Sequence, residues 1–154
     1  MRISITPNLP QFAGRTIGAL AAERGIADRV VFTGPVDEAD LPAVYRCAHV
    51  FSLVSDRGHG RGEGIPLTPL EAMACGVPII VGDEDGSQEA VVEGRNGFVV
   101  SPRSPDPLCA ALLALHGNPD RRSEMAHEAR RNAEMQEALQ VERVARREGL
   151  TESM

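Results

Sequence analysis

The stretch 63–78, which reads EGIPLTPLEAMACGVP, constrains the fold more than any other part of this chain. It predicts a polar loop and then a short helix that begins near Pro66, because a proline in the first turn of a helix loses no hydrogen bond. Gly76 suits the left-handed position that ends a helix, and Pro78 prevents the helix from continuing. Residues 78–81 then predict a short apolar strand.

Two glutamates flank the start of this expected helix. Glu71 falls within its first two turns, and Glu63 lies in the loop before it. Backbone N–H groups at a helix N-terminus have no partner inside the helix and favour an anion. The residues alone leave two interpretations open. Either the glutamates belong to a binding site, or Glu71 is a favourable helix charge and Glu63 a solvated loop residue.

Short apolar strands alternate with helices through most of the chain. This alternation predicts an α/β fold, a Rossmann-like parallel sheet with helices on both faces. The loops 34–37, 55–66 and 82–87 each follow an expected strand, so we expect them to line one rim of the sheet, where such folds bind ligands. The other expected strands are 30–33, 49–54 and 98–100, and the other expected helices are 15–24, 37–47 with a cap at Asp37, 87–92 with a cap at Ser87, and 105–116.

Both ends of the chain give weaker signals. Residues 2–6 alternate like a strand, but prolines and a glycine follow soon after. The stretch 120–148 is rich in Arg and Glu and has weak apolar periodicity, which predicts a solvated helix. We therefore expect a Rossmann-like domain in residues 1–118 and a charged helix with a tail in residues 119–154.

Composition narrows the classes of function. The 154 residues suffice for one domain with a proper core, and the net charge of −6 makes nucleic acid an unexpected partner. We find no run of 18 apolar residues and no leader pattern, so we expect a cytoplasmic protein. Cys47, Cys75 and Cys109 are widely spaced and do not cluster with histidines, so we expect reduced thiols and no zinc site. We also expect no bound cofactor.

The spacing Glu-x(7)-Glu, followed by AMACGVP, resembles the donor-site motif of retaining GT-B glycosyltransferases of the group 1 family (family 4). Three further segments resemble this family in the same order: RVVFTGPV at 29–36, GSQEAV at 86–91 and EGRNGFVV at 93–100. The resemblance covers about residues 14–116. It implies the C-terminal, donor-binding domain of such an enzyme, incomplete at its N-terminal side.

The resemblance implies a role for each matching residue. Glu71 would accept hydrogen bonds from the ribose hydroxyls of a nucleotide-sugar, and Glu63, the candidate catalytic residue, would lie against the donor sugar. Pro66 departs from the pattern, because many relatives carry a glycine there that offers an N–H group. The backbone amides of Gly64, Ile65, Leu67 and Thr68 would reach the sugar and diphosphate, and Gly34, Pro35 and Val36 would border the nucleobase.

The family would transfer a sugar from a nucleotide diphosphate to a sugar or lipid acceptor without a bound metal. We expect this chain alone to be insufficient, because the acceptor-binding domain and the cations that neutralise the departing diphosphate are not recognised in it. Alternatives are a nucleotide-sugar epimerase-like domain and a non-catalytic binding or interaction subunit of a split enzyme. Expected partners are the nucleotide-sugar donor, a chain or domain that carries the acceptor-binding half, and a second copy of this chain, paired through an exposed sheet edge.

Overall fold

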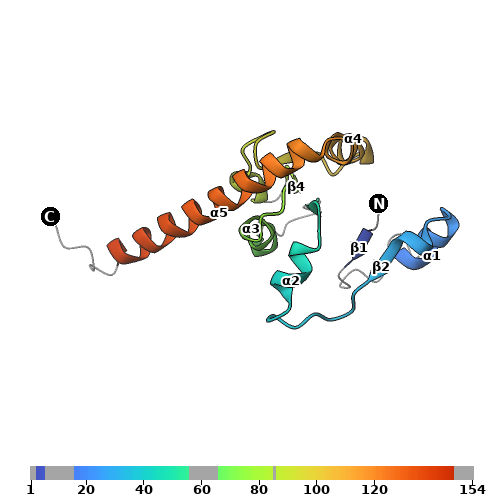
Figure 1. The fold of residues 1–154 in the computed structure, drawn as a ribbon, viewed down its shortest axis with the longest axis horizontal. Helices are drawn as coiled ribbons and strands as arrows, with labels where there is room; N and C mark the ends of the chain where they lie inside the picture. Colours follow the sequence, from blue (N-terminus) through green and yellow to red (C-terminus); the bar gives the residue numbers. More distant parts are fainter. Residues whose placement is uncertain (1–2, 6–15, 56–65, 85, 148–154) are drawn as a thin grey trace. The chain divides into compact units, whose positions relative to one another are not determined.

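The computed structural model describes residues 3–5, 16–55, 66–84 and 86–147. It divides into two compact units, residues 1–41 and residues 42–154, which we describe separately (Figure 1). Three predicted site residues, Glu63, Gly64 and Ile65, lie outside the described residues.

The first unit holds a pair of parallel strands and one helix. Thr16 begins the helix, and its side chain accepts a hydrogen bond from the N–H of Ala19 at 3.1 Å. Gly25 follows the helix with a φ of 65°, as expected of a helix-ending glycine. The ambiguous first residues do include a strand, paired in parallel with the strand expected near residue 30. The elements are β1 (Ile3–Ile5), α1 (Ile17–Glu23), the 3₁₀ helix η1 (Ala27–Arg29) and β2 (Val30–Phe32).

The second unit is built on a parallel sheet of strand order β3-β4-β5. All four residues of the central strand β4 are buried, as a strand flanked on both edges and covered on both faces requires. Its elements are α2 (Leu41–Arg46, which begins at the boundary), β3 (Phe51–Leu53), α3 (Leu67–Ala74), β4 (Ile79–Gly82), the 3₁₀ helix η2 (Ser87–Ala90), β5 (Gly97–Val100), α4 (Pro105–His116) and α5 (Pro119–Arg147).

Alternate side chains of β4 point into two separate cores, which confirms helices on both faces of the sheet. Ile79 and Val81 pack with Ala72 and Met73 of α3. Between them, Ile80 packs on the other side with residues of α4 such as Leu115. The helix expected at 105–116 is confirmed at both ends, with Ser104 as its cap.

The long helix α5 contributes to both cores, so the interpretation of a wholly solvated helix is wrong for its first half. Met125 packs with α4 and Ile80, whereas Ala129 packs with the α3 side, and both are buried. Figure 1 shows α5 running across α3 after α4. The expected division of the chain at residues 118 and 119 stays a prediction.

Two expected helices differ from the structure. The first starts at Leu41 and not after Asp37, because Pro42 lacks the N–H that a helix interior needs. The Asp37 carbonyl instead accepts hydrogen bonds from the N–H groups of Asp40 and Leu41 in a turn before α2.

The helix expected from Ser87 to Val92 is shorter and is a 3₁₀ helix. It begins at Ser87, directly after Gly86, and ends at Ala90. The buried side chain of Asn96 explains this early end. The Asn96 side chain accepts a hydrogen bond from the N–H of Val92 at 2.8 Å and donates one to the carbonyl of Ala90 at 3.0 Å. These bonds replace the helical hydrogen bonds that the backbone would otherwise need. Among the described residues, no helix is both long enough and apolar enough to cross a membrane.

Candidate functional site

The helix α3 begins and ends where its prolines and glycine predict. Pro66 is its N-cap with φ −58° and ψ 134°, and the Pro66 side chain makes no capping hydrogen bond. Leu67 and Thr68 open the first turn and are exposed; 69% of the Leu67 surface is accessible. Gly76 follows the helix with a φ of 75°. The first two residues of the helix are therefore exposed, while Pro69 of the same turn is buried.

The loops that follow the parallel strands begin side by side. A Cβ atom at Gly82, the last residue of β4, would lie 3.1 Å from the carbonyl oxygen of Ser55, which follows β3. The N–H of Asp83 donates to the carbonyl of Val100, at the end of β5, at 3.2 Å. The expected rim is thus confirmed for the residues that start the loops after β3 and β4. The loop 34–37 belongs to the other unit, and its place on this rim stays a prediction.

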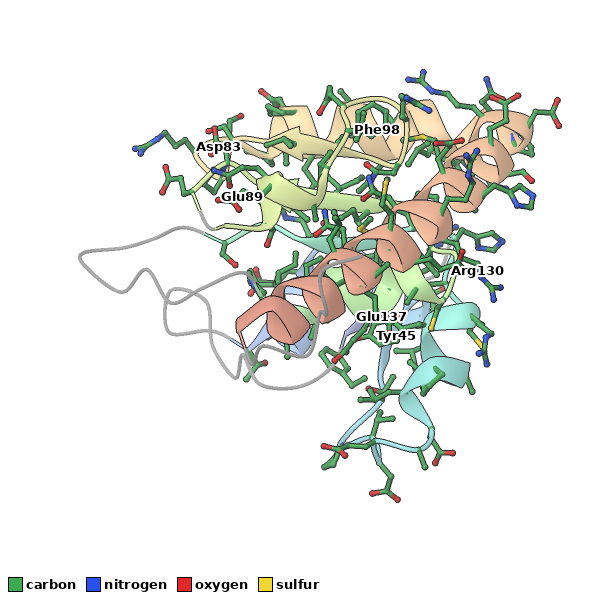
Figure 2. The ribbon with its side chains drawn as sticks, turned by 90° about the vertical axis from the view of Figure 1, so that its left-hand side faces the viewer. Tyr45, Asp83, Glu89, Phe98, Arg130 and Glu137 are labelled. Atoms are coloured by element: carbon green, nitrogen blue, oxygen red, sulfur yellow. The ribbon has the colours of Figure 1, made fainter. Side chains whose placement is uncertain are left out.

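Charged residues gather on the segments that leave this rim. Arg103, after β5, forms an ion pair with Glu84, after β4, and so links the two segments. Asp83 and Glu89 of the same segment are exposed (Figure 2). Glu89 lies in η2, whose first residue Ser87 is buried.

Glu71 is held by a tyrosine from another helix. The hydroxyl of Tyr45, on α2, donates a hydrogen bond of 2.8 Å to Oε2 of Glu71, which is an exposed residue of α3. The Tyr45 ring packs edge-on against Phe51 of β3, with ring centroids 5.8 Å apart and an interplanar angle of 64°. Figure 2 shows Tyr45 near α3. The carboxylate is therefore tied through an aromatic pair to the sheet.

Burial, and then the neighbouring Glu71 carboxylate, raise the pKa of Tyr45 well above its ordinary value of 10.0. The phenol consequently stays protonated, and remains a hydrogen-bond donor, at any pH near neutrality. Among the described residues, the hydrogen bonds made by the Glu71 side chain use Oε2 alone. A carboxylate can accept several hydrogen bonds, so a ligand could bind Glu71 while Tyr45 holds Oε2.

The sequence prediction did not include Tyr45 in the site. Tyr45 is half-buried and packs against the core around α3. The signal available was chemical, because a tyrosine packed against a core usually needs a partner for its hydroxyl. Nothing in the local pattern identifies that partner, because Glu71 lies 26 residues further along the chain.

The other predicted site residues fall in different parts of the structure. Leu67 and Thr68 lie at the start of α3, next to the turn that carries Glu71. Gly34, with a φ of 70°, Pro35 and Val36 lie in the first unit, so their place beside a nucleobase stays a prediction.

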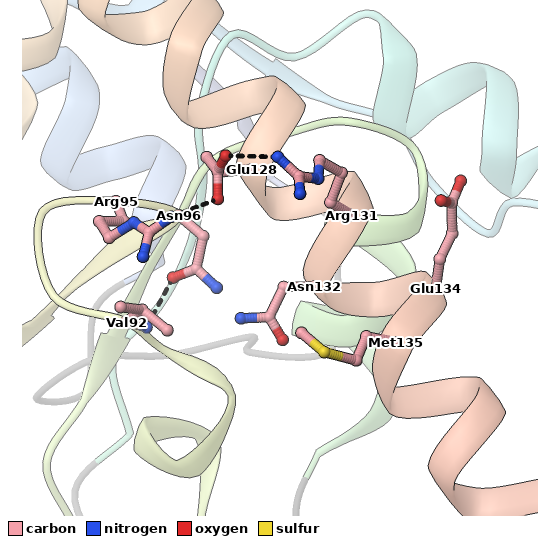
Figure 3. A pocket seen from close by; sticks show the side chains of 8 residues that line it. All are labelled: Val92, Arg95, Asn96, Glu128, Arg131, Asn132, Glu134 and Met135. Carbon is pink, nitrogen blue, oxygen red and sulfur yellow. Dashed lines mark hydrogen bonds and ion pairs between the residues drawn. The ribbon is translucent and has the colours of Figure 1, made fainter.

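A separate hollow of about 520 Å³ lies between α5 and the turn before β5 (Figure 3). Glu128 in its lining pairs with Arg95 at 3.0 Å and with Arg131 at 3.2 Å. Both arginines share this one carboxylate, so the cluster joins α5 to the turn. The hollow is not lined by Glu71, and we do not assign the binding site to it. Its lining residues are Val92, Arg95, Asn96, Glu128, Arg131, Asn132, Glu134 and Met135.

A search for groups of three or more His, Cys, Asp or Glu residues that could hold a metal ion finds none within the described part of the chain.

Comparison with known proteins identifies the family. A family model described as glycosyl transferases group 1 matches residues 14–133, well over half of the chain. The chain belongs to the group 1 glycosyl transferase family. This membership confirms the resemblance found in the sequence, and it favours a glycosyltransferase over an epimerase-like domain.

Two relatives illustrate the match. The chain is 37% identical over 112 residues to a GDP-mannose-dependent alpha-(1-6)-phosphatidylinositol monomannoside mannosyltransferase of Mycolicibacterium smegmatis, a match that covers 71% of this chain and 29% of the relative. It is 36% identical over 115 residues to a D-inositol 3-phosphate glycosyltransferase of Gordonia bronchialis, covering 75% of this chain and 24% of the relative. The chain thus spans less than a third of the length of these relatives.

A solved structure confirms the fold class. The sucrose-phosphate synthase of Thermosynechococcus elongatus superposes with a TM-score of 0.74 at 24% sequence identity, over 95% of this chain and 38% of that protein. At this identity the likeness concerns the fold alone. It agrees with the α/β arrangement of parallel strands and helices expected for this chain.

Proposed function

We propose that this chain supplies the nucleotide-sugar-binding part of a retaining glycosyltransferase, which transfers a sugar from a nucleoside diphosphate to a sugar or lipid acceptor. Membership of the group 1 glycosyl transferase family supports the class of reaction. The observation that carries the binding role is Glu71, an exposed carboxylate within the first two turns of α3, fixed by the Tyr45 hydroxyl at 2.8 Å. A fixed carboxylate suits the two adjacent hydroxyls of a ribose.

The remaining site residues keep the roles expected from the sequence, as proposals. The backbone N–H groups of Leu67 and Thr68 would approach the diphosphate, since both residues are exposed at the start of α3. Glu63 and the amides of Gly64 and Ile65 would face the donor sugar. Gly34, Pro35 and Val36 would border the base.

GDP is the first nucleotide to test, because the mycolicibacterial relative is named as GDP-mannose-dependent. We propose calorimetric titration of the chain with GDP, UDP and ADP, followed by the same titrations of Glu71→Ala. Loss of a hydrogen bond to a charged group costs about 1.5–3 kcal/mol, so the dissociation constant should rise about 10- to 150-fold.

The matched control is Glu124→Ala, which removes an exposed glutamate from α5 and leaves α3 intact. We expect this variant to bind the nucleotide like the wild type. If Glu71→Ala binds as tightly as Glu124→Ala, or if none of the three nucleotides binds the wild-type chain, the proposed role of Glu71 is wrong.

Three further expectations belong to the same proposal. The acceptor would be bound by another domain or chain, and the protein would act in the cytoplasm. A second copy would pair along an unpaired sheet edge. The alternative of a non-catalytic subunit predicts the same nucleotide binding, so binding is the first property to measure.

A further inference from the structure

Resting on the proposed function of Glu71, we propose that Tyr45 is a positioning residue for this carboxylate. The Tyr45 hydroxyl holds one oxygen of Glu71 so that the other oxygen faces the ribose. In this way Tyr45 sets the preference of the site for ribonucleotides. The Tyr45 hydroxyl and Oε2 of Glu71 are 2.8 Å apart. Tyr45 acts on the ligand only through Glu71.

The position of the Tyr45 hydroxyl is set by the core. Its ring packs against Phe51 at the start of β3, and the N–H of Phe51 donates to the carbonyl of Pro78 at 2.9 Å. Both rings also pack against the core that α3 and β4 share. A tyrosine has only two side-chain torsions to fix, so its hydroxyl has little freedom once the ring is packed.

Glu71, in contrast, is long and exposed, and it would sample several rotamers without a partner. Fixing a glutamate side chain costs up to about 2 kcal/mol of conformational entropy. When Tyr45 holds Oε2 before the ligand arrives, that cost is met in the free protein, and the ligand gains affinity through preorganisation. The hydrogen bond lies at the surface, where a single neutral donor adds little stability, so its main effect is on orientation.

The choice of tyrosine fits this role. Its hydroxyl stays protonated because burial and the carboxylate of Glu71 both raise its pKa, with a smaller contribution from Cys75. Glu71 is therefore held equally well across the neutral pH range. A histidine in this place would change its charge near neutrality, and the orientation of the carboxylate would change with it.

The decisive variant is Tyr45→Phe, which removes the hydroxyl and keeps the ring against Phe51. We would measure the dissociation constants of GDP and deoxyguanosine diphosphate, which lacks the ribose hydroxyl next to the base. We expect Tyr45→Phe to weaken GDP by about 2- to 10-fold, the range for one hydrogen bond, and to leave the deoxynucleotide nearly unchanged. The dissociation constant of GDP divided by that of deoxyguanosine diphosphate would then rise, whereas a purely structural defect would weaken both ligands equally.

A double variant tests whether Tyr45 acts through Glu71. In the Glu71→Ala background, Tyr45→Phe should cause no further loss of GDP affinity, because residues that act as one unit are not additive. An equal loss in both backgrounds would contradict the proposal.

A spectroscopic titration tests the contact without any nucleotide. The chain has one tyrosine and no tryptophan, so its tyrosinate absorbance reports Tyr45 alone. Glu71→Gln should lower the pKa of Tyr45 towards the ordinary value, because the carboxylate charge is one of the causes that raise it. An unchanged pKa would overturn the proposed contact.

The outcomes separate this inference from the function on which it rests. If Glu71→Ala binds GDP like the wild type, or if no nucleotide binds, the proposed function fails and the inference fails with it. If Glu71→Ala weakens GDP but Tyr45→Phe leaves the ratio of GDP to deoxyguanosine diphosphate unchanged, only the inference is wrong.

Discussion

The start of β5 has no room for a side chain at residue 97, which is a glycine. A Cβ atom on Gly97 would lie within van der Waals overlap of the Ile79 carbonyl oxygen, and 2.9 Å from Cγ1 of the same residue. The neighbouring backbone belongs to the central strand β4, which pairs with β5 at this position. It has no room to withdraw, because a core is packed on each face of β4.

We therefore predict that Gly97→Ala lowers the free energy of unfolding by about 3 kcal/mol, the upper part of the range for overpacking. The matched control is Gly117→Ala. Gly117 has a φ of −78°, and an added Cβ would lie at an ordinary 3.6 Å from the Leu113 carbonyl oxygen. We expect the control to stay within about 0.5 kcal/mol of the wild type. Urea denaturation measures both, and equal midpoints would show that β5 can shift to make room.

At the scale of single elements, α5 is the helix whose composition and packing disagree most. Its surface carries ion pairs such as Arg130–Glu134 at 3.1 Å, with both side chains more than half exposed. Exposed pairs of this kind add little stability. Two apolar residues of the helix, Met125 and Ala129, are buried, and each belongs to a different core. Packing at these positions, more than surface charge, therefore holds α5 to the rest of its unit.

This argument predicts unequal effects for two methionines of the same helix. Met125 is 1% exposed and Met135 is 58% exposed. Met125→Ala should lower the free energy of unfolding by about 2–5 kcal/mol, because it leaves a cavity, whereas Met135→Ala should change it by less than about 0.5 kcal/mol. Urea denaturation would compare the two variants. Similar losses at both positions would mean that α5 is stabilised by its own helix propensity and not by the core.

At the scale of the whole molecule, the described residues of both cores belong to the second unit. Within residues 16–41, only Ala21 is a buried apolar residue, while Val31 and Phe32 are 42% and 48% exposed. A piece of about 40 residues rarely folds without disulfides, metals or a partner. The second unit therefore carries the stability of the chain.

We predict that a fragment of residues 37–154, which keeps the turn before α2, melts cooperatively and close to the full chain. A fragment of residues 1–36 should show no cooperative transition. Circular dichroism during heating measures both. If residues 37–154 lose the transition that the full chain shows, the first residues contribute to the cores of the second unit.

Much of this architecture follows from local chemistry. The start and end of α3 follow from Pro66 and Gly76, because proline fixes φ and glycine permits positive φ wherever they occur. The bounds of α4 follow from Ser104 and the apolar face behind it. The helix expected after Asp37 begins only at Leu41, because Pro42 has no N–H group to donate within a helix. The 3₁₀ helix η2 is shorter than expected because Asn96, which lies outside it, bonds its last carbonyl.

The sequence by itself determined the alternation of strands and helices and the family, and it predicted Glu71 as the carboxylate of the candidate site, since these depend on residue types at short spacing. Only the tertiary structure brought Tyr45 to Glu71, excluded a side chain at residue 97 and buried Met125 in a helix of charged residues. Each of these depends on contacts between distant segments, and a contact across the fold leaves no periodic signal along the chain.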